Sequence, residues 1–210
     1  MITVHHLNRS RSHRILWLFE ELELDYQVIH YERDPRTHLA PPELKKIHPL
    51  GKSPVIEMDG EVIAESGAIV ELICTRFAPQ MIPLRPTPEF IHHTQLMHFA
   101  EGSAMGPILL NLYVNSLGEA GAPLHPRIQQ QLEDHFSYMN SQLRPSGHFV
   151  LDQLSAVDIL FSFPAEIAIG LGGAQKYQGL ANFVEKIQAR PAYHRAYVRG
   201  GELAPPASFG

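Results

Sequence analysis

Residues 53–69 read SPVIEMDGEVIAESGAI, and this stretch carries the pattern that decides the fold of the first part of the chain. Two short apolar runs, at 55–57 and 62–64, flank the pair Asp59-Gly60. An Asp-Gly pair tolerates the positive φ angles of a tight hairpin turn, so the stretch predicts two antiparallel strands. A helix is then expected from about Ser66 to Phe77.

The residues before this hairpin predict a strand, a helix and a second strand. Residues 2–7 and 26–31 are the strand candidates, and the polar stretch 8–12 separates the first of them from a helix. The apolar side chains of that helix recur at the spacing of one helical face; they are Ile15, Leu18, Phe19 and Leu22. With a short helix before the hairpin, this order predicts a mixed sheet covered by helices, an α/β domain.

Prolines mark the end of this first part. Four prolines between residues 79 and 88 interrupt regular structure and predict a domain boundary there. The rest of the chain reads as a helical bundle; its helices are expected at about 89–117 and 126–143, with shorter ones beginning at Ser155, Leu180 and Pro191. Pro107 is expected to bend the first long helix, because its ring crowds the Ser103 carbonyl and offers it no donor.

Composition narrows the classes of function. The 210 residues are 44% hydrophobic and carry a formal net charge of −5. Because a nucleic-acid surface needs clustered cations and no Lys/Arg block is present, small ligands or proteins are the expected partners. The N-terminus lacks a signal-peptide pattern, and no apolar run approaches about 18 residues. The sequence therefore predicts a cytoplasmic protein without membrane or nucleic-acid partners.

The cysteine, the histidines and the pair Ser155 and Asp158 are expected to have structural rather than catalytic roles. Cys74 is the only cysteine and falls in an apolar helical pattern, so a buried role is expected and any thiol chemistry must use an external thiol. The thirteen histidines show no HExxH spacing, and no metal is expected. Ser155 and Asp158 have the spacing of a reciprocal helix cap, with Leu154 and Ile159 placed to pack across it.

Several stretches together resemble a known family. They are 6–14 (HLNRSRSHR), 40–56 (APPELKKIHPLGKSPVI), 64–69 (AESGAI) and 154–164 (LSAVDILFSFP). They resemble cytosolic glutathione transferases of the serine type, and most of all a branch shared by fungi and bacteria. The resemblance implies a thioredoxin-like glutathione-binding domain at 1–79, a linker at 80–88 and an all-helical domain at 89–210. It also implies glutathione as co-substrate and a homodimer.

The resemblance assigns the two ends of glutathione to different loops. Ser66 and the start of its helix suit the γ-glutamyl carboxylate, and Glu65 suits the ammonium group. Ser53 and Pro54 resemble the family's cis-proline turn, whose backbone pairs with the cysteinyl part. Ser66 alone could instead be only a helix cap.

Two basic residues are assigned to the glycyl end. Lys52 can reach the glycyl carboxylate, although a solvated lysine is the simpler interpretation. His38, from the preceding loop, could assist.

The thiol of glutathione needs a hydrogen-bond donor, because free cysteine has a pKa of about 8.5 and only the thiolate attacks. In serine-type members this donor is a hydroxyl between the first strand and helix. Ser10 matches that position, four residues before Arg14. Asn8 and Ser12 stay as alternatives, and Ser12 also suits a helix cap.

The second-substrate region is assigned to the first long helix. Met105, Leu109 and Tyr113 share one apolar face with a single hydroxyl, a pattern that core packing also explains. Glu101 is expected to approach the ammonium group of glutathione in the opposite subunit, or else to be a surface glutamate.

The predicted function is conjugation of the glutathione thiolate to apolar electrophiles, as in detoxification. Glutathione-dependent peroxidase and disulfide reductase activities are the nearest alternatives, because the same thiolate can attack oxygen or sulfur. A further alternative is a non-catalytic protein-interaction module of the same fold.

Overall fold

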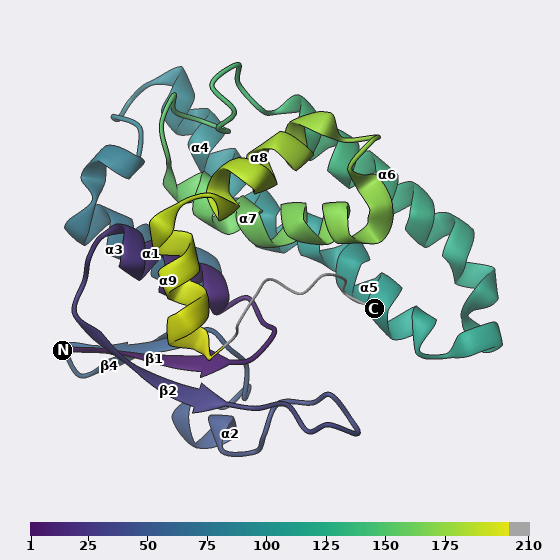
Figure 1. Cartoon of the computed structure of the whole chain (residues 1–210), viewed down its shortest axis with the longest axis horizontal. Coiled ribbons are helices and arrows are strands. Elements are labelled where there is room, and N and C mark those ends of the chain that lie inside the picture. Colours follow the sequence, from purple (N-terminus) through teal and green to yellow (C-terminus); the bar gives the residue numbers. More distant parts are fainter. Residues whose placement is uncertain (202–210) are drawn as a thin grey trace. The chain divides into compact units, whose positions relative to one another are not determined.

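The computed structural model describes residues 1–201, which form two compact units (Figure 1). One unit consists of Met1–Gln80 and residues 187–201, and the other is Met81–Lys186. The first contains all four strands, and the second is built from helices. The predicted fold class, an α/β domain followed by a helical region, is confirmed. The last helix, however, groups with the first unit, which the sequence pattern did not indicate.

The sheet of the first unit is mixed, as the sequence predicts. Its strands are β1 (Ile2–Leu7), β2 (Tyr26–Tyr31), β3 (Val55–Met58) and β4 (Glu61–Ala64), in the order β2-β1-β3-β4. β1 is parallel to β2 and antiparallel to β3, and β3 and β4 form the hairpin that the Asp59-Gly60 turn predicts. Both turn residues have positive φ, 55° and 86°. A crossover through α1 therefore connects the parallel strands β1 and β2, and a tight turn connects the antiparallel strands β3 and β4.

Helices complete the first unit; they are α1 (His13–Glu21), α2 (Leu44–Ile47), α3 (Ser66–Phe77) and α9 (Pro191–Gly200). α1 packs against α3 on one side and α9 on another. Every residue from His13 to Phe19 is buried, and Trp17 is fully inaccessible. A helix that is buried all round needs neighbours on more than one face, and α9 supplies one of them. α1 is thus the central helix of this unit.

The second unit is a bundle of helices. Its α-helices are α4 (Pro88–Phe99), α5 (Met105–Asn115), α6 (His125–Ser141), α7 (Ala156–Ala168) and most of α8 (Gln178–Gln188). A 3₁₀ segment, Gly118–Leu124, precedes α6. α7 is the core helix of the bundle and packs against α4, α5 and α6. Its aromatic contacts include Phe149 stacked on Phe161, with ring centroids 4.5 Å apart.

The first long helix is interrupted where the sequence predicts a bend. A π-helical turn, Ala100–Ala104, separates α4 from α5 and ends three residues before Pro107. Because proline has no N–H, the carbonyl one turn earlier loses its usual partner, and a widened turn accommodates the change. A second π-helical turn, Ile169–Gly173, ends α7, and Gly172 within it has φ 87°. The glycine-rich stretch there is a helix end, as predicted.

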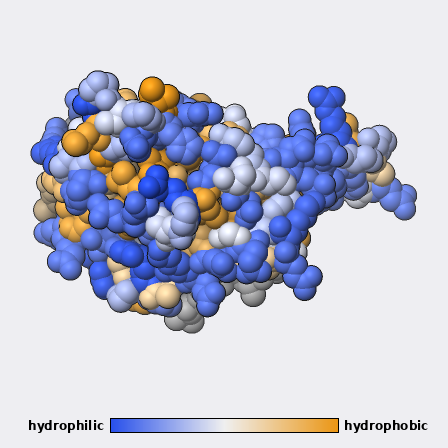
Figure 2. Space-filling view, turned by 90° about the horizontal axis from the view of Figure 1, so that it is seen from above, coloured by the Kyte–Doolittle hydropathy of each residue, from blue (hydrophilic) through white to orange (hydrophobic). Residues whose placement is uncertain are grey.

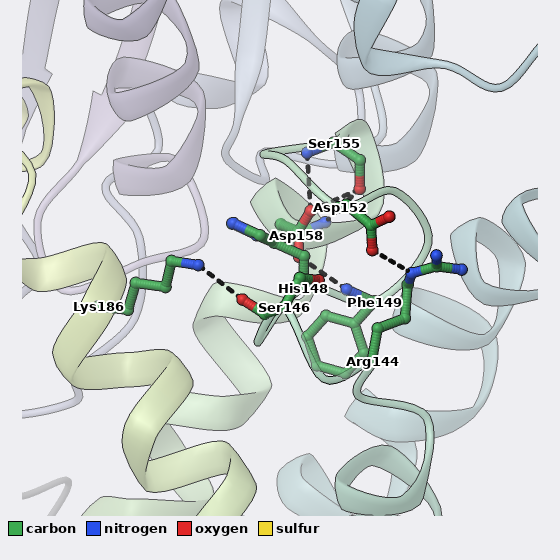
Figure 3. A network of polar contacts seen from close by, with 8 residues as sticks. All are labelled: Arg144, Ser146, His148, Phe149, Asp152, Ser155, Asp158 and Lys186. Carbon is green, nitrogen blue, oxygen red and sulfur yellow. Dashed lines mark hydrogen bonds and ion pairs between the residues drawn. The ribbon is translucent and has the colours of Figure 1, made fainter.

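The predicted cap at the start of α7 is confirmed and is more extensive than the spacing indicates (Figure 3). The Ser155 amide and hydroxyl donate to Asp158 Oδ2 at 2.7 and 2.5 Å. The Phe149 amide donates to Oδ1 of the same carboxyl at 3.1 Å. Asp158 is fully buried, so these donors compensate the loss of water around its oxygens. The carboxyl therefore joins the preceding loop to the helix.

One described helix, Ala156–Gly173, is apolar and long enough to span a membrane by length and composition alone, and 61% of it is buried inside the protein. That burial is typical of a core helix. On the face shown in Figure 2, hydrophobic residues gather in patches bordered by polar residues, and further exposed hydrophobic side chains, such as Leu84 and Val198, occur singly in the sequence. Single exposed apolar residues are normal in folded proteins.

Candidate active site in the first unit

The loop between β1 and α1 brings two serine hydroxyls together inside the first unit. Ser10 Oγ lies 2.8 Å from Ser12 Oγ and accepts the Ser12 amide at 3.2 Å. Ser12 occupies the position before α1, and its carbonyl accepts the Ile15 and Leu16 amides. Its hydroxyl does not cap the helix, contrary to the expectation for Ser12. It points the other way, towards β1.

The Ser12 hydroxyl is held by the end of β1. It donates to the Leu7 carbonyl at 3.2 Å and lies 2.9 Å from Nδ1 of His6. Ser12 and His6 are fully buried, whereas 7% of Ser10 is exposed. Of the two serines, Ser10 is therefore the one that is partly exposed to solvent. Because Ser10 also lies at the N-terminal side of α1, the partial positive charge of that helix end favours an anion nearby.

Asn8, the first alternative to Ser10, is hydrogen-bonded to the loop after β2. Its Oδ1 accepts the Arg33 amide at 3.0 Å, and its carbonyl accepts Arg33 Nε at 3.3 Å. Arg33 also donates through Nη1 to the carbonyl of His38 at 3.0 Å. The arginine thereby ties the loop that carries Ser10 to the loop that carries His38. Both loops contain a residue of positive φ, Arg9 at 50° and His38 at 57°.

The turn before β3 contains the expected cis peptide bond between Ser53 and Pro54. The Ser53 hydroxyl donates to the His5 carbonyl at 2.8 Å and accepts the Leu7 amide at 3.3 Å. The Ser53 side chain therefore attaches this turn to the backbone of β1. Only the backbone of Ser53 is left to pair with a ligand.

Glu65 and Ser66 lie where β4 ends and α3 begins. Glu65 stands in the position before the helix, with φ 70° and ψ 119°, and Ser66 is its first residue. A glutamate at positive φ costs of order 1–3 kcal/mol and is found where function fixes the backbone. Glu65 is exposed and Ser66 is buried. Since Ser66 lies inside the helix, the simple capping role considered for it does not apply; its amide is one of the free donors of the first turn.

Lys52 and His38 lie on two further loops of the first unit. Both are exposed, and Lys52 follows Gly51, whose φ is 57°. A side chain at Gly51 would come within 2.7 Å of the Lys45 side chain, so the turn that presents Lys52 requires glycine. The thiol of Cys74 plays no part, because it is buried in α3 and burial raises its pKa to about 12.

Comparison with known proteins identifies the family. The family model described as glutathione S-transferase, N-terminal domain, matches residues 1–74. Glutathione S-transferase 3 of Schizosaccharomyces pombe is 31% identical, over 91% of this chain and 85% of that protein. The chain belongs to the glutathione S-transferase family. Glutathione S-transferase 1 of Saccharomyces cerevisiae is 27% identical over 92% of each chain.

A solved glutathione S-transferase from Actinobacillus pleuropneumoniae has the same fold over nearly the whole length. Its TM-score is 0.86 at 30% sequence identity, and the match covers 97% of this chain and 94% of that one. The similarity of the chain to fungal and bacterial glutathione S-transferases is thus shown.

The structure brings most of the predicted glutathione residues onto loops of one unit. Asn8, Ser10, Ser12, His38, Lys52, Ser53, Pro54, Glu65 and Ser66 all belong to the first unit. The remaining predicted residues belong to the second. Glu101 is half-buried in the π-helical turn, Met105 is buried at the start of α5, Leu109 is half-buried and Tyr113 is 59% exposed. Among residues 1–201, no three His, Cys, Asp or Glu side chains are grouped as a metal site.

Two residues that contact the loops of the candidate site were not found from the sequence. Arg33 ties the two loops, but an arginine after a strand has no distinctive pattern. His6 contacts Ser12 from the end of β1, and a histidine in a buried strand more often signals packing. Its one sequence signal is its place in the stretch 6–14 that resembles the family.

Proposed function

We propose that this glutathione S-transferase transfers glutathione to apolar electrophiles, with Ser10 as the donor that stabilises the thiolate. The observation that carries the proposal is the Ser10 hydroxyl: it lies between β1 and α1, is fixed by the Ser12 amide, and is the least buried of the loop's two serines. A fixed donor beside the sulfur lowers the pKa of the thiol towards neutrality. Ser10 forms no covalent bond to the substrate; it stabilises charge.

The rest of glutathione is proposed to lie along the loops of the first unit. The ammonium group pairs with Glu65, and the γ-glutamyl carboxylate accepts hydrogen bonds from Ser66 at the start of α3. The backbone of Ser53, held by the cis bond to Pro54, pairs with the cysteinyl part. Lys52 and His38 face the glycyl carboxylate.

The electrophile and the subunit partner are assigned to residues of the second unit. Met105, Leu109 and Tyr113 on α5 are proposed to contact the apolar substrate. We also propose a cytoplasmic homodimer in which Glu101 of one subunit approaches the ammonium group bound to the other. In the reaction the sulfur forms a bond to the electrophilic carbon, the leaving group departs with its electron pair, and the thiol proton passes to solvent.

Ser10→Ala tests the proposal. Turnover should fall by roughly 10- to 1000-fold, as for removal of one anion-stabilising donor, while glutathione affinity stays within a few-fold. Ser12→Ala and Asn8→Ala are the matched variants, and unchanged activity of Ser10→Ala would move the role to one of them. The assay should include an aryl halide, a hydroperoxide and a mixed disulfide. Activity on the last two alone would replace transfer by peroxidase or reductase activity, and no retention on immobilised glutathione would favour a non-catalytic module.

A further inference from the structure

The loops that follow β1 and β2 leave the sheet side by side. Leu7 and Tyr31, the last residues of the two parallel strands, are paired, and the Asn8 amide continues the ladder by donating to the Tyr31 carbonyl at 3.0 Å. The two loops therefore begin at the same edge of the sheet. The first carries Ser10 and the second carries His38, which are proposed to serve the thiol and the glycyl carboxylate of glutathione.

Arg33, in the loop after β2, donates hydrogen bonds to both loops. Its backbone amide donates to Asn8 Oδ1 at 3.0 Å, and its Nε donates to the Asn8 carbonyl at 3.3 Å. The two terminal nitrogens bond to different loops: Nη1 donates to the His38 carbonyl at 3.0 Å, and Nη2 donates to the Arg9 carbonyl at 3.5 Å. One guanidinium group therefore binds three backbone carbonyls from two loops.

The two carbonyls bound by the terminal nitrogens belong to residues with unfavourable backbone conformations. Arg9 has φ 50° and His38 has φ 57°, in the left-handed region that residues other than glycine seldom adopt. Such conformations persist where surrounding contacts hold them, and they cluster at functional sites. The bonds from Arg33 are contacts of this kind. Because Arg9 directly precedes Ser10, the backbone conformation of Arg9 determines the position of Ser10 in its loop.

The turn that contains His38 is closed by its own contacts. Asp34 Oδ1 accepts the Arg36 and Thr37 amides at 3.0 and 2.7 Å, and the Asp34 carbonyl accepts the His38 amide at 2.8 Å. These bonds hold the turn together as one compact piece. Arg33 then attaches this piece to the loop between β1 and α1 at a single point, the His38 carbonyl.

A guanidinium group is suited to this task, and an ammonium group is not. The donors of arginine lie in one plane at fixed angles and can bind several acceptors at once, whereas lysine is a point charge on a flexible stem. Arg33 is half-buried, and its bonds to Arg9 and His38 are partly solvated. Each bond is therefore weak alone. The contribution of Arg33 lies in joining two loops rather than in the energy of any single contact.

We infer that Arg33 is a positioning residue, which holds the loop that carries Ser10 and the loop that carries His38 in one fixed arrangement. The inference deepens the proposed function and rests on the roles of Ser10 and His38 in it. Arg33 restricts both loops before glutathione binds, so less conformational entropy is lost on binding and the thiol meets its donor at a fixed place. Activation of the thiol and binding of the glycyl carboxylate then depend on the same side chain.

The first test compares Arg33→Gln with Arg33→Lys, which keeps the charge but not the planar group of donors. Glutathione affinity is measured by calorimetry, and the pKa of the bound thiol is measured from the ultraviolet absorbance of its thiolate. Both variants should weaken affinity and lower turnover about 3- to 10-fold and raise the thiol pKa, less than loss of the Ser10 donor does. Arg33 lies outside the strands and helices, so both variants are expected to fold.

Two results of this comparison would overturn the inference. If Arg33→Lys behaved like the original protein and only Arg33→Gln were impaired, the charge of Arg33 would matter and its hydrogen-bond geometry would not. If both variants lost thermal stability but kept the affinity and the thiol pKa, the role of Arg33 would be purely structural.

The second test examines each loop separately with double variants. Added to His38→Ala, Arg33→Gln should weaken glutathione affinity little further, because the group that it positions is already absent. Added to Ser10→Ala, it should raise the thiol pKa little further for the same reason. Full additivity in both pairs would show that Arg33 acts independently of the two residues, and the inference would be wrong.

Two single variants separate failure of the inference from failure of the proposed function. Arg36→Gln is the control, because it removes one positive charge from an exposed position of the same loop; it should leave turnover and the thiol pKa unchanged. Ser10→Ala must raise the thiol pKa more than either Arg33 variant. If it does and Arg33→Gln changes neither the affinity nor the thiol pKa, the inference is wrong and the role of Ser10 stands. If Ser10→Ala has no effect, the proposed function fails at its donor.

Discussion

Arg190 binds the carboxylate of Glu21 through two parallel hydrogen bonds, from Nε to Oε1 at 2.5 Å and from Nη2 to Oε2 at 2.8 Å. The two residues are 169 positions apart in the chain, one directly before α9 and the other at the end of α1. Glu21 also accepts the indole N–H of Trp17 at 2.8 Å. Only 10% of the Glu21 side chain is exposed, so the pair is held in a poorly solvated site. This contact, together with the packing of Tyr193 and Tyr197 on His13, attaches the last helix to the first unit.

Loss of the Glu21 carboxylate should weaken this attachment. Glu21→Gln removes a bidentate, charge-assisted contact, and a double-mutant cycle with Arg190→Gln should show a coupling of about 1–3 kcal/mol in the free energy of unfolding. The exposed pair of Lys176 and Glu133 is the matched control, and its cycle should show little coupling because solvent screens it. Equal coupling in the two cycles would contradict the assignment.

The loop before α7 and its cap contain one buried and one exposed aspartate, Asp158 and Asp152, whose contributions to stability can be compared (Figure 3). Asp158→Ala leaves the Ser155 and Phe149 amides without an acceptor in the core, so the free energy of unfolding should fall by about 3–5 kcal/mol. Asp152→Ala, the control, removes a carboxylate that is 73% exposed and bonded to Arg144, and should change stability little. Chemical denaturation measures both. If both variants lowered the free energy of unfolding by similar amounts, burial would not explain the contribution of Asp158 to stability.

Stability should also depend on pH through His13. Burial first, and the nearby His6 second, lower the pKa of His13 from 6.5 to about 3, and its ring packs 3.8 Å from that of Tyr197. Between these two pKa values the unfolded chain binds a proton that the folded one does not, so stability falls as the pH is lowered. The contribution of His13 to that fall should reach roughly 3 kcal/mol by pH 4.

His13→Phe keeps an aromatic ring and should flatten the dependence of unfolding free energy on pH in this window. His194→Gln, an exposed histidine of α9, controls for the loss of one histidine. Parallel curves for the original protein and His13→Phe would show that His13 is not the group responsible.

Much of this fold could be predicted because its signals are local. The strands lie at 2–7 and 26–31, where the sequence predicts them, and the hairpin follows from Asp59-Gly60. The spacing of Ser155 and Asp158 is sufficient to predict their cap. Such features depend on neighbours a few residues away, and the sequence displays those directly.

The features that escaped prediction depend on residues far apart. No local pattern connects Glu21 with a helix at the other end of the chain. The contacts of the Ser12 hydroxyl were missed for the same reason, since a serine before a helix is expected to cap it until the positions of His6 and the Leu7 carbonyl are known. The side chain of Ser53 could not be assigned either, because its partners are backbone groups of β1.

Glu65→Ala tests the proposed binding of the ammonium group. Glutathione affinity should fall about tenfold or more, as for loss of a charged hydrogen bond, while the pKa of the bound thiol hardly changes because Glu65 serves the opposite end of the ligand. Glu61→Ala removes an exposed carboxylate from β4 and is the control for net charge. Normal affinity of Glu65→Ala in a calorimetric titration would remove Glu65 from the proposed site.

Glu101→Gln tests the proposal that one subunit completes the site of the other. Glu101 is half-buried in the π-helical turn, and the substitution keeps its shape while removing its charge. In a symmetric dimer each copy would serve the ligand of its partner. A carboxylate desolvated beside the ammonium group should contribute about 1–3 kcal/mol to glutathione binding, whereas a solvated surface glutamate should contribute less than about 1. Titration of the intact dimer with glutathione distinguishes these values, and sedimentation shows whether the active species is dimeric. Unchanged affinity, or full turnover by a monomer, would contradict the shared site, because a residue that acts across a subunit boundary can have no effect when that boundary is absent.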